Sequence, residues 1–364
     1  MDVLQWPWFA FAGGLLAGAC AGLAARLASF CTLNAIERWF YAGDLSGLRS
    51  WALAGLVALV LTQSMLIVGV VDLSQSFYLS PLLGLTGAIG GGLMFGYGMA
   101  LVGTCGFGAL VRLGGGSLKS LVALIVLAVF ALATQKGVLS ILRVVTVDNL
   151  ALDLSPAGEQ SLPGVVSALT GLDLRIPMVI AVALGLGTFV FSGGIPRRAR
   201  ARFAAGGVIG AAIAAGWLIS SLASQYGFTI VQIESMSFVV PVADTVIQIT
   251  AYTGILPDLG VGMVIGVVAG AAAGALIRHD VRWEACDDAR ELSRHMAGAA
   301  LMGIGGVCAM GCTIGQGVSA LSLMAVSAPI VLISIILGAR LGLAYLIGGA
   351  SLPLFRRRDD LPAE

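Results

Sequence analysis

Long apolar runs separated by short polar stretches follow one another along the whole chain. A helix needs about 20 largely apolar residues to cross a bilayer. None of the runs shows the ten-residue alternation that is typical of a membrane β-barrel. The pattern predicts an all-α polytopic membrane protein with about nine transmembrane helices. These lie near residues 8–28, 51–71, 82–101, 117–135, 176–195, 203–222, 259–277, 298–313 and 328–349.

The composition supports a membrane protein. Of the 364 residues, 58% are hydrophobic and only 11% are charged, and the mean hydropathy is +0.99. A soluble core cannot hide that much apolar surface under so few charges, whereas a lipid-facing bundle needs no polar coat. The first residues lack the basic region of a cleavable signal peptide, so we expect the first apolar run to remain as a span.

The distribution of lysine and arginine predicts the orientation, because these residues gather in cytoplasmic loops. Seventeen of the 20 fall in or beside residues 26–49, 103–119, 196–202, 278–297 and 340–358. Lys136, Arg143 and Arg175 alone belong to the loop 136–175. We therefore expect the N-terminus and this loop outside the cell and the C-terminus in the cytoplasm.

A glycine and cysteine pattern occurs twice, 207 residues apart. The offset carries the second to fourth spans onto the seventh to ninth, and each pair crosses in opposite directions. This predicts one transporter domain, 1–364, with inverted repeats at about 8–135 and 203–349. The outer loop 136–175 and an extra span, 176–195, link them. The paired residues are Gly96 and Gly303, Gly98 and Gly305, Cys105 and Cys312, and Gly108 and Gly315.

Two segments are too polar for spans and too apolar for free loops. Residues 30–40 form an amphipathic piece after the first span, and residues 223–258 mix apolar residues with Glu234 and Asp244. We expect a short re-entrant or interfacial helix in each.

The two glycine-cysteine breaks are the candidate site. Non-helical backbone at membrane depth is tolerated only inside protein or along a wet cavity. Glycine lets backbone approach a ligand, and a helix that resumes after a break offers free amides to an anion. The alternative is that these glycines only let helices pack closely. The candidate residues are Gly103, Thr104, Cys105, Gly106, Gly108, Gly311, Cys312, Thr313 and Gly315, with Gln316, Arg112 and Glu234 as secondary candidates.

The thiols narrow the choice of anion. A hard oxyanion is normally bound by arginine, lysine and backbone amides, yet the spans hold almost no basic residue. Thiols at Cys31, Cys105 and Cys312 suit an anion with a sulfur end. We expect all six cysteines to be free, with Cys20 and Cys308 as small buried hydrophobes. For Arg112, we favour anchoring at the headgroups over holding an anion.

Other functions have weaker support in the sequence. Soft thiolates select copper(I) or zinc, and Cys308 and Cys312 share a helix face, which leaves a soft-metal transporter open. However, His279 and His295 both lie in a charged loop, outside the spans. No catalytic triad or nucleotide-binding motif is present, so we expect no enzyme, no cofactor and no resident metal. A membrane scaffold that delivers sulfur to a partner also remains open.

Three phrases in the chain resemble the YeeE/YedE family of bacterial inner-membrane sulfur transporters. The first is Phe30-Cys31-Thr32, and the second joins Gly96-Tyr97-Gly98 to Gly103-Thr104-Cys105-Gly106. The third begins with Gly311-Cys312-Thr313-Ile314-Gly315. The resemblance implies nine spans, broken helices that meet at the centre, and uptake of thiosulfate past Cys31, Cys105 and Cys312. It also implies a cytoplasmic TusA-like sulfur-carrier protein as a partner of some members, and selenium compounds as a substrate alternative. The loop 136–175 matches no feature of the resemblance.

Overall fold

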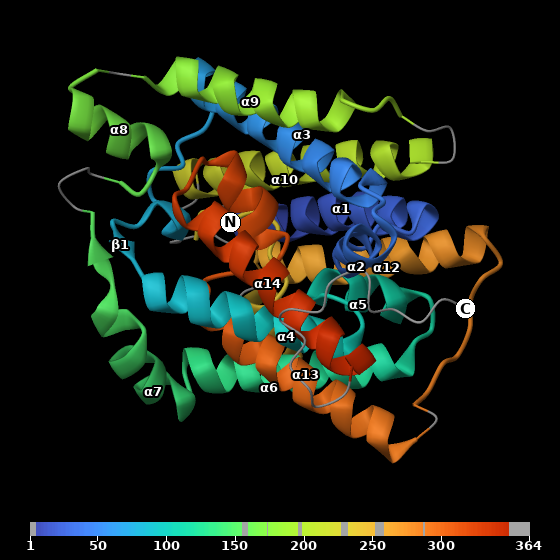
Figure 1. Ribbon diagram of the computed structural model, residues 1–364. Coiled ribbons are helices and arrows are strands. Elements are labelled where there is room, and N and C mark those ends of the chain that lie inside the picture. The colour runs from blue at the N-terminus through green and yellow to red at the C-terminus, as the bar shows by residue number, and fades with distance from the viewer. Residues whose placement is uncertain are drawn as a thin grey trace.

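Helices make up nearly the whole molecule (Figure 1). The computed structural model describes residues 5–154, 159–172, 174–195, 199–226, 232–251, 258–286 and 288–348. It is 77% helical with almost no strand, which confirms the all-α prediction. Seven helices in this described part are long and apolar enough to cross a membrane. The count of nine is not confirmed, because α9 (Arg175–Phe191) has 17 residues and α13 (Ala289–Cys308) carries charges in its first turns.

The elements before residue 136 and those after residue 199 follow each other in the same order. The first series is α1 (Gln5–Ala28), α2 (Thr32–Ala42), α3 (Ser46–Val68), the π-helix η3 (Gly87–Gly91) leading into α4 (Gly92–Val102), α5 (Gly106–Gly114) and α6 (Leu118–Gln135). The second is α10 (Arg200–Tyr226), α11 (Val240–Thr250), α12 (Leu259–Ile277), α13, the π-helix η7 (Gly315–Ala320) and α14 (Ser327–Gly348). The short helices α2 and α11 confirm that each polar segment contains one.

The connections gather at two opposite ends of the bundle (Figure 1). One end, here named the α8 end, carries β1 (Leu82–Leu83), α7 (Leu139–Thr146), η4 (Asp148–Leu150), β2 (Leu152–Asp153) and α8 (Leu162–Thr170). The other, the α2 end, carries α2 and the connection from α12 to α13. There Arg26 binds Asp280 at 2.9 Å, and Lys119 lies 3.6 Å from Glu291. The arginines at 197, 198 and 356–358, which the orientation prediction also uses, lie outside the described residues.

Glycine stripes let the central helices touch along their backbones. Gly14, Gly18 and Gly22 of α1 face α12, and a Cβ on Gly18 would overlap the Met263 carbonyl oxygen. From the other side, a Cβ on Gly266 would overlap the Leu15 carbonyl oxygen. Small residues four apart allow this close approach in membrane helices, where lipid supplies no hydrophobic drive.

The glycine contacts also fix the directions of the helices. Gly14, Gly18 and Gly22 meet Leu259, Met263 and Val267 in the same order, so α1 and α12 run parallel. Gly206 and Gly210 of α10 meet Ser50 and Ala54 of α3 in the same way. In contrast, Gly91 at the end of η3 and Gly98 of α4 meet Gly305 and Gly298 of α13 in reverse order. The counterparts α4 and α13 therefore run antiparallel, which an inverted repeat requires.

Candidate functional site

Two helix breaks with the same local geometry lie inside the bundle. After α4, Gly103 takes the left-handed backbone conformation at φ +75°, and Cys105 precedes α5. The Cys105 Sγ accepts a hydrogen bond from the Gly108 amide at 3.4 Å. After α13, Met310 has a φ of +56°, and Cys312 Sγ accepts from the Gly315 amide at 3.4 Å. Each thiol thus caps one of the free amides at the start of the next helical segment.

The three candidate cysteines come together, although they are far apart in the sequence. Cys105 is 1% exposed and Cys312 is fully buried, and Cys105 lies within electrostatic range of both Cys31 and Cys312. Cys31 is half-buried at the start of α2, where its side chain makes no capping bond. Its thiol is therefore not committed to holding the helix end.

The neighbours of the breaks leave almost no free volume. A Cβ on Gly106 would lie 3.1 Å from the Phe238 carbonyl oxygen, and one on Gly108 would overlap the Thr104 hydroxyl. Thr104 and Thr313 are both buried. A side chain at Gly106 would press on the Phe238 carbonyl oxygen, and one at Gly108 would force the Thr104 side chain to move.

A cavity at the α2 end reaches the first break. Its volume is ≈ 230 Å³, and Cys31, Thr104 and Gly108 belong to its lining. Arg26, Arg112 and Arg278 line it too, against the single carboxylate of Asp280. Three guanidinium groups facing one carboxylate give the cavity a positive balance, which favours an anion.

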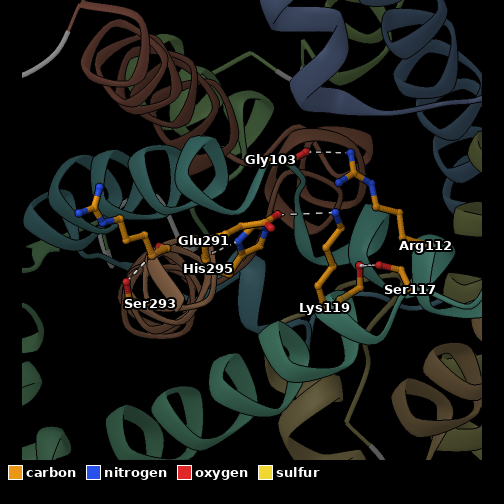
Figure 2. A network of polar contacts seen from close by, with 9 residues as sticks. Gly103, Arg112, Ser117, Lys119, Glu291, Ser293 and His295 are labelled. Carbon is orange, nitrogen blue, oxygen red and sulfur yellow. Dashed lines mark hydrogen bonds and ion pairs between the residues drawn. The ribbon is translucent and has the colours of Figure 1, made fainter. Parts of the chain in front are cut away.

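Arg112 is tied to the backbone of the first break (Figure 2). Its guanidinium donates to the Gly103 carbonyl oxygen at 2.9 Å. In the same network, Glu291 of α13 pairs with Lys119 of α6, and its carbonyl oxygen lies 2.8 Å from His295 Nδ1. The Lys119–Glu291 pair joins α6 to α13, while the Arg112 bond joins α5 to the end of α4 at the break. Arg112 thus lines the cavity and also positions the chain at Gly103.

A second cavity opens at the α8 end. Its volume is ≈ 250 Å³, and Gln63, Asp72, Glu159 and Arg175 are among its lining residues. A smaller space of ≈ 20 Å³ lies between β1 and the second break, lined by Gln160, Cys308 and Gln316 among others. Cavities thus lie at both ends of the bundle, and the one at the α2 end has Cys31 in its lining.

Gln316 fixes the backbone of the second break. Its side-chain amide donates to the carbonyl oxygens of Ala309 and Met310 at 3.0 and 3.2 Å, and its oxygen accepts from Ser327 at 3.3 Å. Every polar atom of this buried side chain is thus engaged within the protein. Gln316 is thus placed to support the backbone of the second break.

Glu234 belongs to the extended segment before α11. It interacts with Asp244 and Asp258, and its carboxylate faces Gly260 of α12. Tyr78 is a shared neighbour of Glu234 and Cys312. Glu234 is therefore close to the second break without being part of it.

Sequence reasoning missed three residues that surround Cys312. Tyr78, in the 3-10 helix η2 (Phe77–Leu79), and Ser237 both face Gly315, and the Phe238 ring lies 5.1 Å from that of Phe107. The 207-residue offset contained a signal for one of them, since it places Phe238 opposite Cys31. No comparable signal in the sequence points to Tyr78, because only folding brings this connection to the break.

The other cysteines lie away from the three central thiols. Cys286 lies in the connection from α12 to α13. The expectation that Cys20 and Cys308 are buried is wrong, because Cys20 is exposed on α1 and Cys308 is only half-buried, where it lines the small α8-end space. All six thiols are free, as predicted. The described residues contain no group of three or more His, Cys, Asp and Glu side chains that could hold a metal ion.

A helical bundle with membrane-spanning helices, and with two helix breaks buried in its interior, is typical of a multi-pass membrane transport protein. The chain belongs to the sulphur transport family, YeeE/YedE, whose family model matches residues 27–341. It is therefore a sulfur-related membrane transporter, and a small anion fits as its substrate. Comparison with curated proteins found no match.

Proposed function

We propose that this protein imports thiosulfate, or a closely related inorganic sulfur anion, across the bacterial inner membrane. The observation that carries the proposal is the meeting of Cys31, Cys105 and Cys312 between cavities at the two ends of the bundle. Thiols are soft and polarisable, so they suit the terminal sulfur of thiosulfate better than a hard oxyanion. The family supports a sulfur compound as cargo.

The proposed path begins in the α8-end cavity and ends in the α2-end cavity. The anion passes Cys312, then Cys105, then Cys31, and its sulfur contacts each thiol in turn without a covalent change. The amides that begin α5 and η7 face its oxygens, because the first amides of a helix lack partners within that helix. Arg26, Arg112 and Arg278 then favour the anion in the last cavity.

The path rests on two inverted repeats, at about 8–135 and 203–349, joined through 136–175 and α9. The matching order of elements and the antiparallel run of α4 and α13 support this division. An inverted repeat places two equivalent breaks at one site and allows one half to move against the other. Residue 349, the last of the second repeat, lies outside the described residues.

A TusA-like sulfur carrier is the partner that we propose for the α2 end. This end carries exposed charged and aromatic residues, including Arg282 and Trp283, beside the cavity where the anion would leave. In our proposed orientation that end faces the cytoplasm, where such a carrier acts. Copurification of the carrier with the wild-type protein, and its loss in Trp283→Ala, would support this partner.

Uptake into liposomes tests the proposed function directly. Purified wild-type protein should carry radiolabelled thiosulfate into vesicles. Cys105→Ala and Cys312→Ala should each lower the initial rate of uptake at least about tenfold, because each variant loses one contact between a thiol and the anion. Cys20→Ala is the matched control, since this thiol is exposed on α1 and should leave the rate unchanged. Full uptake by both central variants would contradict the thiol path. Absence of wild-type uptake, with carrier binding intact, would favour a scaffold.

A further inference from the structure

Several buried hydroxyl groups in the described part of the chain have no hydrogen bond of normal geometry, and two of them lie beside Cys105 and Cys312. These two are the phenol of Tyr78, which is 1% exposed, and the hydroxyl of Thr313, which is fully buried. Buried polar groups almost always have partners, and an unpaired one destabilises the fold. Two such groups beside the central thiols therefore need an explanation.

The Tyr78 hydroxyl lies near Cys312, and the Thr313 hydroxyl lies near Cys105. A Cβ on Gly315 would lie 2.9 Å from the Tyr78 hydroxyl and 2.8 Å from that of Ser237, so both oxygens face the start of η7. The Ser237 hydroxyl is the polar side chain next to the Tyr78 phenol, although no bond of normal geometry joins them, and Cys312 is another neighbour of Tyr78. Thr313 lies beside the Cys105 thiol, which is only a weak hydrogen-bond partner. Each hydroxyl thus stands next to one of the two buried cysteines.

Packing holds the Tyr78 hydroxyl in place. The Tyr78 ring meets Trp217 edge-on at 6.2 Å between centroids and lies 4.0 Å from the Phe77 ring. The Trp217 indole is itself fixed, since it donates to the Ser322 hydroxyl at 3.1 Å. A phenol on a rigid ring has little freedom to lose on binding, so its donor is already oriented for a ligand.

We propose that Tyr78 and Thr313 bind the oxygen atoms of the transported anion, and that they select sulfur anions that carry oxygen. This inference rests on the proposed function and adds a division of roles within it. The thiols contact sulfur, while the hydroxyls donate hydrogen bonds to oxygen. An anion without oxygen, such as hydrosulfide, leaves both hydroxyls without an oxygen acceptor and is disfavoured.

Tyr78→Phe is the sharpest test, because it removes a single oxygen atom and keeps the ring. We expect the KM for thiosulfate in liposomes to rise at least about tenfold, since a hydrogen bond to a charged group is lost. The melting temperature should stay level or rise, because the variant no longer buries an unpaired hydroxyl. Thr313→Val is the equivalent change at the other hydroxyl and should act in the same direction. Tyr97→Phe is the control, since this ring packs on Tyr345 instead.

Competition separates oxygen recognition from general damage. Unlabelled sulfite should compete with thiosulfate in the wild type and should lose potency in Tyr78→Phe, whereas hydrosulfide should compete weakly in both. An unchanged KM together with unchanged competition in Tyr78→Phe would overturn the inference, and the same result in Thr313→Val would remove Thr313 from it. If the wild type takes up no thiosulfate, the proposed function itself fails, which is a different outcome.

Discussion

At the scale of single residues, the same side-chain type has different tasks at the two breaks. Cys105 and Cys312 each cap an amide, whereas Cys31 makes no capping bond. Arg112 and Gln316, which the sequence offered as secondary site residues, both bind carbonyl oxygens of the breaks. These bonds hold the backbone of each break in one conformation, whereas glycine only makes that conformation accessible.

Gln316→Met should therefore reduce stability more than substrate affinity. The change leaves the buried Ala309 carbonyl without its donor, for an expected loss of about 1–3 kcal/mol. Thermal unfolding in detergent measures this loss, and transport by the folded fraction should keep its KM. Gln225→Met, on the exposed end of α10, is the control and should change stability by less than about 0.5 kcal/mol. A raised KM without a change in melting would instead assign Gln316 to substrate binding.

At the scale of elements, glycine decides how closely the helices pack. The contact of α1 with α12 and of α3 with α10 brings backbone against backbone, and each of these contacts joins the first series of helices to the second. In the sequence analysis, close helix packing is the alternative to a ligand-binding role for the glycines near the cysteines. The structure contains both uses, with packing glycines on α1 and α12 and break glycines at 103 and 311.

Gly266→Ala tests the packing role. The added Cβ would overlap the Leu15 carbonyl oxygen, so α1 and α12 must separate, with a loss of about 1–3 kcal/mol. Gly207→Ala on α10 is the matched control, because nothing lies within 4 Å of its Cβ position. There the better helix propensity of alanine should raise stability by up to about 1 kcal/mol. Equal melting temperatures for the two variants would contradict this account of the interface.

At the scale of the whole molecule, the two ends of the bundle differ in charge and in connections. The described basic residues that we predict for the cytoplasmic side, including Arg26, Arg112 and Lys119, lie at the α2 end. The α8 end carries the helices of the loop 136–175 instead (Figure 1). This separation is what the positive-inside rule needs in order to set an orientation.

Single-cysteine labelling tests that orientation. Trp283 and Val138 are 78% and 85% exposed and lie at the α2 and α8 ends, respectively. A membrane-impermeant maleimide added to intact spheroplasts should label Val138→Cys and should reach Trp283→Cys only after the membrane is opened. The reverse pattern would invert the orientation and with it the proposed direction of transport.

The sequence by itself determined the class of protein, the helical fold, the two breaks and the order of the elements. These features can be read from the sequence because apolar runs, glycine clusters and cysteines determine the local structure of the segments in which they occur. Only the tertiary structure decided that Tyr78 stands beside Gly315, that Gln316 closes the second break, and that three arginines share a cavity with Cys31. Such contacts join segments that are distant in the chain, and they depend on helix packing that no local pattern encodes.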